Sequence, residues 1–165
     1  SGILVFAKTS AAAKELNRQL TTSGFGKHYY ALVSGTPGQP SANLENYLVK
    51  DARTNTSRIC NKGTANAKLA KLHYDLTDTT FFTDIASSIS SETSQLKIKL
   101  DTGRHHQIRV QLSDMGCPII GDTKYNPDTP KLPTGRTPLC LCAYQLDFTH
   151  PATKKAMTFS LDHYA

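Results

Sequence analysis

One stretch of the sequence decides the fold, and it reads Leu96-Lys97-Ile98-Lys99-Leu100-Asp101-Thr102-Gly103-Arg104-His105-His106-Gln107-Ile108-Arg109-Val110-Gln111-Leu112. Within residues 96–100, apolar side chains alternate with lysines, and this pattern predicts a strand with one buried face. The strand should end at 101–103, where Asp101 or Thr102 can cap a following helix. The stretch therefore predicts a strand, a tight turn and the start of a helix.

The apolar residues Ile108, Leu112 and Met115 stand at helical spacing and predict a helix from about Arg104 to Met115. On such a helix the guanidinium groups of Arg104 and Arg109 and the free amides of the helix start would point into the same small volume. This arrangement fits an anion, either a phosphate of a ligand or a carboxylate of the protein itself. A solvated basic helix face is the alternative interpretation.

Residues 102–110 resemble the signature T-G-R-x-H-Q-I-R-V of the RluA-type pseudouridine synthases, which isomerise uridine in ribosomal and transfer RNA. Residues 116–125 are similar to the G-x-P-I-V-G-D-x-x-Y of that family, and residues 27–35 resemble its K-x-Y-x-A-L-V-x-G. The chain departs from the family pattern at Cys117 and Cys142, where histidine is usual.

The resemblance implies roles for several side chains. Tyr29 would lie in the active site and pack on the target base, although a strand tyrosine is ordinarily a core residue. Arg109 would pair with the catalytic aspartate and favour its ionised form. Arg104 could bind a phosphate or brace Arg109. The side chains expected to contact RNA are Lys27, Arg104, His106, Gln107 and Leu141.

The catalytic aspartate of the family belongs to the motif R-L-D-x-x-T-S-G, which precedes a strand of the form L-L-V-x-A-K. Residues 1–8 are similar to the end of that motif and to its strand, so a strand is expected over Gly2 to Ala7. In this register the aspartate would stand four residues before Ser1. We therefore expect the chain by itself to be inactive, for want of the catalytic aspartate, and the protein it came from to be active.

Composition sets further bounds. The chain has 165 residues and 38% hydrophobic content, enough for one domain with a real core. We assign 1–165 to a single catalytic domain that lacks its N-terminal part. The net charge of +6 and an isoelectric point near 9.2 suit a polyanionic partner, here structured RNA. No apolar run approaches a membrane span, so we expect a cytoplasmic monomer with no membrane partner.

Neither a metal nor a cofactor is expected. The four cysteines and six histidines lack the spacing of a metal site, and reduced structural thiols are the simpler interpretation. The resemblance also implies a reaction that needs no cofactor.

The predicted fold class is α+β, a mixed and mostly antiparallel sheet with flanking helices and a cleft where Tyr29 and Arg109 meet. Residues 44–51 predict a short helix or strand. The other elements predicted from local pattern are a helix over 10–20 and strands over 27–35, 65–76, 81–85, 139–148 and 156–161.

Three function classes remain open. The first is an RNA pseudouridine synthase, and the second is a non-catalytic RNA-binding module on the same fold. The natural sequence upstream of Ser1 would separate them, because an R-L-D-x-x-T ending favours the enzyme. A hydrolase that handles phosphate through His106 and a cysteine is weaker, since no phosphate loop or nucleophile elbow is present.

Overall fold

The computed structural model describes residues 1–22, 24–79, 81–133 and 135–161. In this part of the chain the named strands form an antiparallel seven-stranded sheet of order β3-β2-β4-β5-β1-β6-β7, which confirms the predicted fold class. The elements are α1 (Ser10–Leu20), β1 (Gly26–Ser34), β2 (Ser41–Asp51), β3 (Thr56–Cys60), β4 (Lys68–Leu76), α2 (Thr83–Ser87), β5 (Thr93–Leu100), α3 (Gln107–Asp114), β6 (Leu141–Thr149) and β7 (Ala156–Ser160).

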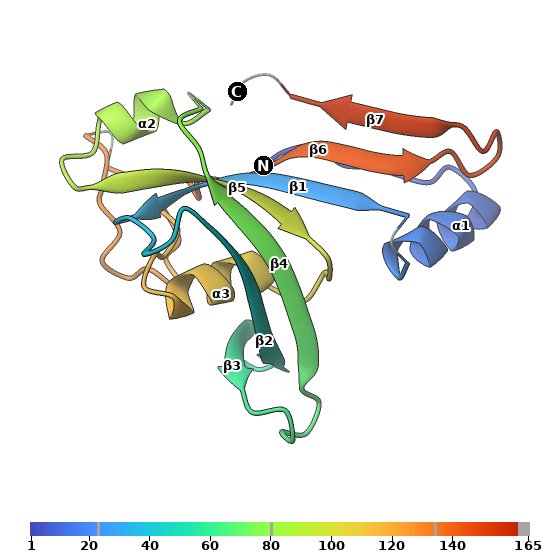
Figure 1. Cartoon of the computed structure of the whole chain (residues 1–165), viewed down its shortest axis with the longest axis horizontal. Coiled ribbons are helices and arrows are strands. Elements are labelled where there is room, and N and C mark those ends of the chain that lie inside the picture. The colour runs from blue at the N-terminus through green and yellow to red at the C-terminus, as the bar shows by residue number, and fades with distance from the viewer. Residues whose placement is uncertain (23, 80, 134, 162–165) are drawn as a thin grey trace.

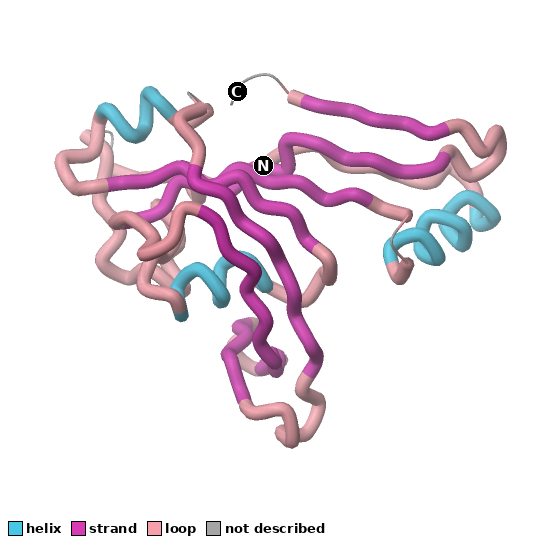
Figure 2. Tube along the Cα trace, in the orientation of Figure 1, coloured by secondary structure: helices cyan, strands magenta, loops and turns pink. Residues whose placement is uncertain are grey.

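The sheet spreads into two arms that diverge from the paired central strands β1 and β5 (Figure 1). One arm holds β2, β3 and the start of β4, and the other holds β6 and β7 with α1 beside them. Figure 2 shows that long strands run through both arms, that α3 lies against the middle of the sheet, and that α1 and α2 lie near its ends. None of the helices in the described ranges has the length and apolarity that crossing a membrane requires.

The core lies along the paired strands β1 and β5. In β5, buried residues alternate with lysines toward the end of the strand, as the sequence predicted, and Leu96 and Ile98 are fully enclosed. Ala31 and Leu32 of β1 are buried although they point to opposite faces. Both faces of the sheet are therefore covered at these two strands, and Leu112 of α3 belongs to the same cluster.

Two sequence predictions are wrong. Residues 2–7 form no strand, because only Gly2 makes a bridge, to Ala143, and the side chains of Leu4 and Phe6 are 75% and 83% exposed. The strand predicted over 81–85 is instead the beginning of the short helix α2. Periodicity alone does not separate a strand from a helix in so short an apolar run.

The helix of the deciding stretch starts later than predicted. α3 begins at Gln107, and its N-cap is His106, which has a left-handed backbone with φ of 52°. Thr102 does not cap the helix; its hydroxyl accepts a hydrogen bond from the Lys71 amide and donates one to the Gln107 side chain. The same Gln107 oxygen accepts from the Arg104 amide. Residues 104–106 therefore form an ordered loop in front of the helix.

Candidate functional site

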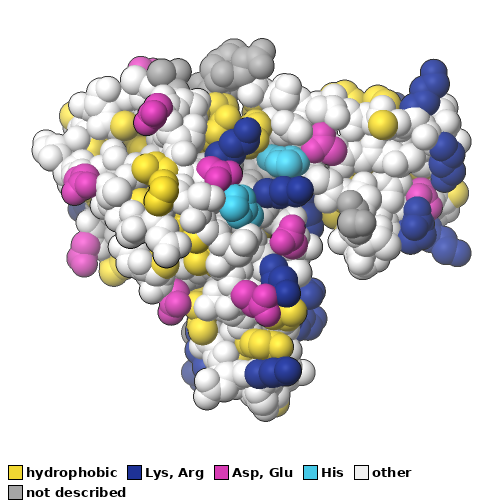
Figure 3. All heavy atoms as spheres, in the orientation of Figure 1, with side chains coloured by type: hydrophobic (Ala, Val, Ile, Leu, Met, Phe, Trp, Pro, Cys, Tyr) yellow, Lys and Arg dark blue, Asp and Glu magenta, His cyan; other side chains and the backbone are white. Residues whose placement is uncertain are grey.

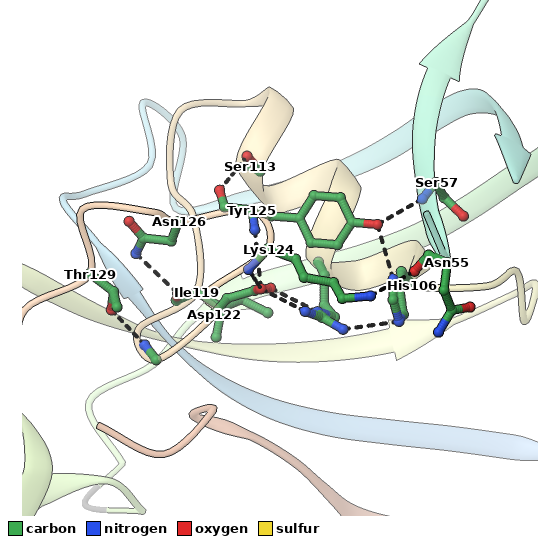
Figure 4. A network of polar contacts seen from close by, with 12 residues as sticks. Asn55, Ser57, His106, Ser113, Ile119, Asp122, Lys124, Tyr125, Asn126 and Thr129 are labelled. Carbon is green, nitrogen blue, oxygen red and sulfur yellow. Dashed lines mark hydrogen bonds and ion pairs between the residues drawn. The ribbon is translucent and has the colours of Figure 1, made fainter. Parts of the chain in front are cut away.

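Arg109 of α3 forms a bidentate ion pair with Asp122. Its Nε and Nη2 donate to the two carboxylate oxygens at 2.8 and 2.6 Å. The side chain of Asp122 is fully buried and that of Arg109 is 16% exposed, so the pair is largely shielded from water. Figure 4 shows the pair at the centre of a network that joins α3 to the loop after it and to β3. Removing either partner of such a shielded pair would leave the other charge without compensation, which is strongly destabilising.

Asp122 is held from several sides. Gly121 before it has φ of +80°, and a side chain there would collide with the carbonyl of Pro138, so only glycine lets the chain pass at this point. The amides of Lys124 and Tyr125 also donate to the carboxylate, at 3.0 and 3.2 Å. Burial by itself would raise the pKa of Asp122, but the hydrogen bonds that it accepts outweigh burial and hold the pKa below its usual value.

His106 continues this network. Its Nε2 accepts a hydrogen bond from Nη1 of Arg109 at 3.0 Å, so the ring is neutral and carries its proton on Nδ1. That proton is donated to the hydroxyl of Tyr125, 3.0 Å away, which also accepts from the Ser57 amide at 2.7 Å. Burial and the charge of Arg109 lower the pKa of His106 to about 4. The ring is therefore neutral at physiological pH.

The neighbouring His105 ties the same loop to β3. Its Nδ1 lies 2.9 Å from Oγ of Ser57, and its ring stacks on that of His106 with centroids 3.8 Å apart. Together these contacts fix residues 105 and 106 against β3 before any ligand arrives.

The two arginines of the motif do not converge on one anion. In Arg109, Nε, Nη1 and Nη2 all donate inside the chain, to Asp122 and His106. Arg104 lies in the loop, where its Nε donates to the carbonyl of Leu69 at 2.8 Å. No hydrogen bond or ring contact joins Arg109 to Tyr29 in the described ranges. The carboxylate that Arg109 holds in this structure is Asp122, and its predicted catalytic role stays a prediction.

Lys27 and Arg104 lie close to each other beside Gly103. A side chain on Gly103 would place its first carbon 3.1 Å from Nζ of Lys27. Partial burial lowers the pKa of Lys27, the positive charge of Arg104 lowers it further, and the negative charge of Asp101 opposes both effects. Two cations and one carboxylate leave net positive charge here, which favours a further anion.

Tyr29 and Leu141 share one face of the sheet. In the pairing of β1 with β6, Tyr29 lies opposite Ala143 and Ala31 lies opposite Leu141, so Tyr29 and Leu141 are diagonal neighbours. Lys27 is two residues before Tyr29 on the same strand face. Burial raises the pKa of Tyr29, which keeps its phenol protonated. The predicted site residues of β1 and β6 are thus brought together.

The amino end of the chain lies beside Leu141. The amine of Ser1 donates to the Leu141 carbonyl at 3.2 Å, and the Ala143 amide donates to the Ser1 carbonyl at 3.1 Å. Ser1 is therefore next to the strand face that carries Tyr29 and Leu141.

Gln107 and His106, both predicted to contact RNA, are used by the chain itself. Gln107 is 2% exposed, and its amide binds Thr102, the Arg104 amide and the carbonyl of Lys71. Both ring nitrogens of His106 also have partners within the chain. These two side chains build the loop that presents Arg104.

Sequence reasoning missed Asp122, Tyr125 and Ser57 as parts of this network. The only signal for the first two was their place in the second matching motif, residues 116–125. Ser57 carried no local signal, because its role depends on β3 folding back onto the loop before α3. Among the described residues, no group of three or more His, Cys, Asp or Glu side chains could hold a metal ion.

Comparison with known proteins gives the family. The family model for RNA pseudouridylate synthases matches residues 1–114, so this chain belongs to that family. It is 35% identical to the dual-specificity RNA pseudouridine synthase RluA of Haemophilus influenzae and 31% identical to that of Escherichia coli. These matches cover 97% and 96% of this chain and 67% of each relative.

Solved structures agree with the fold. The structure of human RNA pseudouridylate synthase domain containing 1 matches with a TM-score of 0.71 at 22% identity, over 93% of this chain and 61% of the human one. The structure of human RNA pseudouridylate synthase domain containing 4 matches with a TM-score of 0.70 at 21% identity. This match covers 94% of this chain and 64% of the human one. The chain therefore spans 61% to 67% of the length of these four proteins.

Proposed function

We propose that the full-length protein is an RNA pseudouridine synthase that isomerises uridines of structured RNA, either ribosomal or transfer RNA. The proposal is supported by membership of the family and by the names of the relatives. The structural observation that carries it is the shared strand face of Tyr29 and Leu141, which lies beside Ser1 and has Lys27 at one end. An aromatic ring and an apolar side chain on one surface suit a flat base.

The reaction breaks the bond between the ribose and N1 of uracil, turns the base and rejoins it through carbon. We propose that the catalytic carboxylate comes from an aspartate four residues before Ser1, in the register of the family motif. Ser1 lies at Leu141, so a residue four positions earlier is within about 14 Å of this strand face. The protonated phenol of Tyr29 would pack on the base, and the side chain of Leu141 on the same strand face would contact the base as well.

A cation beside that carboxylate would keep it ionised. We assign this cation to Arg104 in place of Arg109, because the guanidinium of Arg109 already donates to Asp122 and His106. Only Nε of Arg104 has a hydrogen-bond partner among the described residues, which leaves its two terminal nitrogens for a carboxylate or a phosphate. The proposed role of Arg109 is then to position the loop that carries Arg104. No metal or cofactor is part of the proposal, and we propose a cytoplasmic monomer.

The experiment is direct. The full-length protein is incubated with total RNA from cells that lack its gene, and pseudouridine is mapped in ribosomal and transfer RNA. We expect new pseudouridines at specific positions, and none with residues 1–165 alone. If the full-length protein binds RNA but forms no pseudouridine, the binding-module alternative replaces the enzyme.

A further inference from the structure

A cavity of about 340 Å³ lies between the arm of β2, β3 and β4 and the loop before α3. We propose that it binds one phosphate of the RNA backbone beside the target uridine. This inference rests on the proposed function and adds a substrate subsite to it. The residues that line the cavity are Leu48, Lys50, Ser57, Asn66, Lys68, Gly103, Arg104 and His105.

Strand pairing brings the two lysines to one face. Lys50 lies opposite Ser57 in the pairing of β2 with β3, and Lys68 lies opposite Leu48 in the pairing of β2 with β4. Directly paired residues point to the same side of a sheet, and so do residues two apart on one strand. Leu48 packs with Val110 of α3, so this is the face toward α3 and its preceding loop.

The opposite wall of the cavity is fixed before any ligand binds. Arg104 is anchored by the hydrogen bond from its Nε to the Leu69 carbonyl, one residue after Lys68. His105 is anchored by its contact with Ser57. A guanidinium held in this way keeps its terminal nitrogens in place, so that little side-chain entropy is lost when a phosphate binds.

The cavity carries positive charge without an acidic neighbour. Lys50, Lys68 and Arg104 line it, and no Asp or Glu within the described ranges does. The pKa of His105 is lowered mainly by burial and further by the positive charges of Lys50 and Lys124. These two charges therefore lie close to the wall of the cavity that His105 forms. A phosphate supplies the charge that these groups lack.

The other face of the sheet is different. There positive and negative side chains are interleaved, as Figure 3 shows. Lys71 pairs with Glu45 at 2.7 Å, and the two histidines of that face each lie against an aspartate. On that face the positive side chains are paired with negative ones, so it should attract a polyanion less strongly than the cavity does.

The cavity also adjoins the proposed active site. Gly103 and Arg104 line it, and Gly103 is in turn next to Lys27, on the strand face of Tyr29. A backbone that delivers its uridine to Tyr29 can pass Gly103, where the ammonium of Lys27 is the neighbouring group, and place a neighbouring phosphate between Lys50, Lys68 and Arg104. Phosphate contacts of this kind set the position of a nucleic acid without reading its sequence.

The test compares the full-length wild type with a Lys50→Gln, Lys68→Gln double variant. Affinity for a short RNA hairpin with a uridine-containing loop is measured by fluorescence anisotropy over a series of KCl concentrations. Loss of one phosphate contact should weaken binding about tenfold. It should also reduce the slope of log K against log salt by about 0.7 to 1. Both lysines are exposed, so the variant should unfold at the wild-type temperature.

Two controls sharpen the result. A Lys50→Arg, Lys68→Arg variant keeps the charges and should bind like the wild type. A Lys155→Gln variant removes an exposed charge next to β7, in the other arm, and should leave the salt slope unchanged. A single neutral methylphosphonate, moved along the hairpin, should find one position that weakens wild-type binding but not binding by the double glutamine variant.

Unchanged affinity and salt slope in the double glutamine variant would overturn the proposal, as would equal methylphosphonate penalties in both proteins at every position. Failure of this inference and failure of the proposed function are distinguishable. If the wild type forms pseudouridine and the double variant binds RNA equally well, only the phosphate subsite falls. If the wild type forms none but the salt slope still drops in the variant, the subsite stands and the enzymatic function falls.

Discussion

Arg104 and Arg109 come from one short motif, yet their surroundings are opposite. Arg109 is enclosed, and its guanidinium is satisfied by Asp122 and His106. Arg104 lines a basic cavity, and in the part of the chain that the structure describes only its Nε has a hydrogen-bond partner. The comparison shows that two arginines of one motif can have different roles. One guanidinium stabilises the fold, and the other remains available for a ligand. Each prediction below tests that division.

The largest expected effect is on stability. Asp122→Ala leaves the charge of Arg109 without its partner in a shielded site, and should lower the free energy of unfolding by about 3 kcal/mol. Urea denaturation followed by circular dichroism measures it. Glu15→Gln, which breaks the exposed pair with Arg18, is the matched control and should leave the midpoint nearly unchanged. Equal effects of the two substitutions would show that the Arg109 pair is no scaffold.

The next effect concerns activity and separates the two arginines. Arg104→Gln in the full-length protein should reduce the rate of pseudouridine formation by about 100-fold, since it removes the cation proposed to stand by the catalytic carboxylate. It should leave the melting temperature within about 1 °C of wild type, because the side chain lies at the rim of a cavity.

Arg109→Lys provides the contrast to that variant. It keeps a charge but loses the bidentate geometry, and should lower the melting temperature while retaining more activity per folded molecule than Arg104→Gln. The reverse pattern, with a stable but inactive Arg109→Lys, would restore Arg109 as the catalytic cation.

A smaller effect is expected from the hydroxyl that joins the network to β3. Tyr125→Phe leaves the buried Ser57 amide and Nδ1–H of His106 without their acceptor, and should cost about 1 to 2 kcal/mol. Tyr47→Phe is the control, because no hydrogen bond of the Tyr47 hydroxyl is present among the described residues. Thermal unfolding of the two variants at one pH makes the comparison.

The smallest effect is a pH dependence. The pKa of His106 is about 4 in the folded chain, below its ordinary value near 6.5, so the unfolded chain binds the proton first. Between these two values stability should therefore fall as the pH is lowered, and above about 6.5 this contribution should be constant. His106→Asn, which keeps a residue that accepts a left-handed backbone, should reduce the loss of melting temperature between pH 7 and pH 5. An unchanged loss would show that His106 is not the group responsible.

The sequence by itself determined the fold class and the family. Alternation over 96–100 and helical spacing from residue 108 depend only on which residues share a face, and the structure has β5 and α3 in these places. The motifs also indicated Tyr29, Leu141 and Lys27, because each stands at a fixed offset within one strand.

The tertiary structure decided which partner each charge has. Asp122 reaches Arg109 only because Gly121 lets the chain pass the carbonyl of Pro138, and Lys50 meets Arg104 across a cavity only because β3 and β4 fold back on β2. The start of α3 at Gln107 has the same kind of cause, since Lys71 of the neighbouring strand β4 binds both Thr102, the predicted cap, and the side chain of Gln107. Local pattern fixes which side of an element a residue faces, whereas contacts between distant segments depend on chain reversals that no local period encodes.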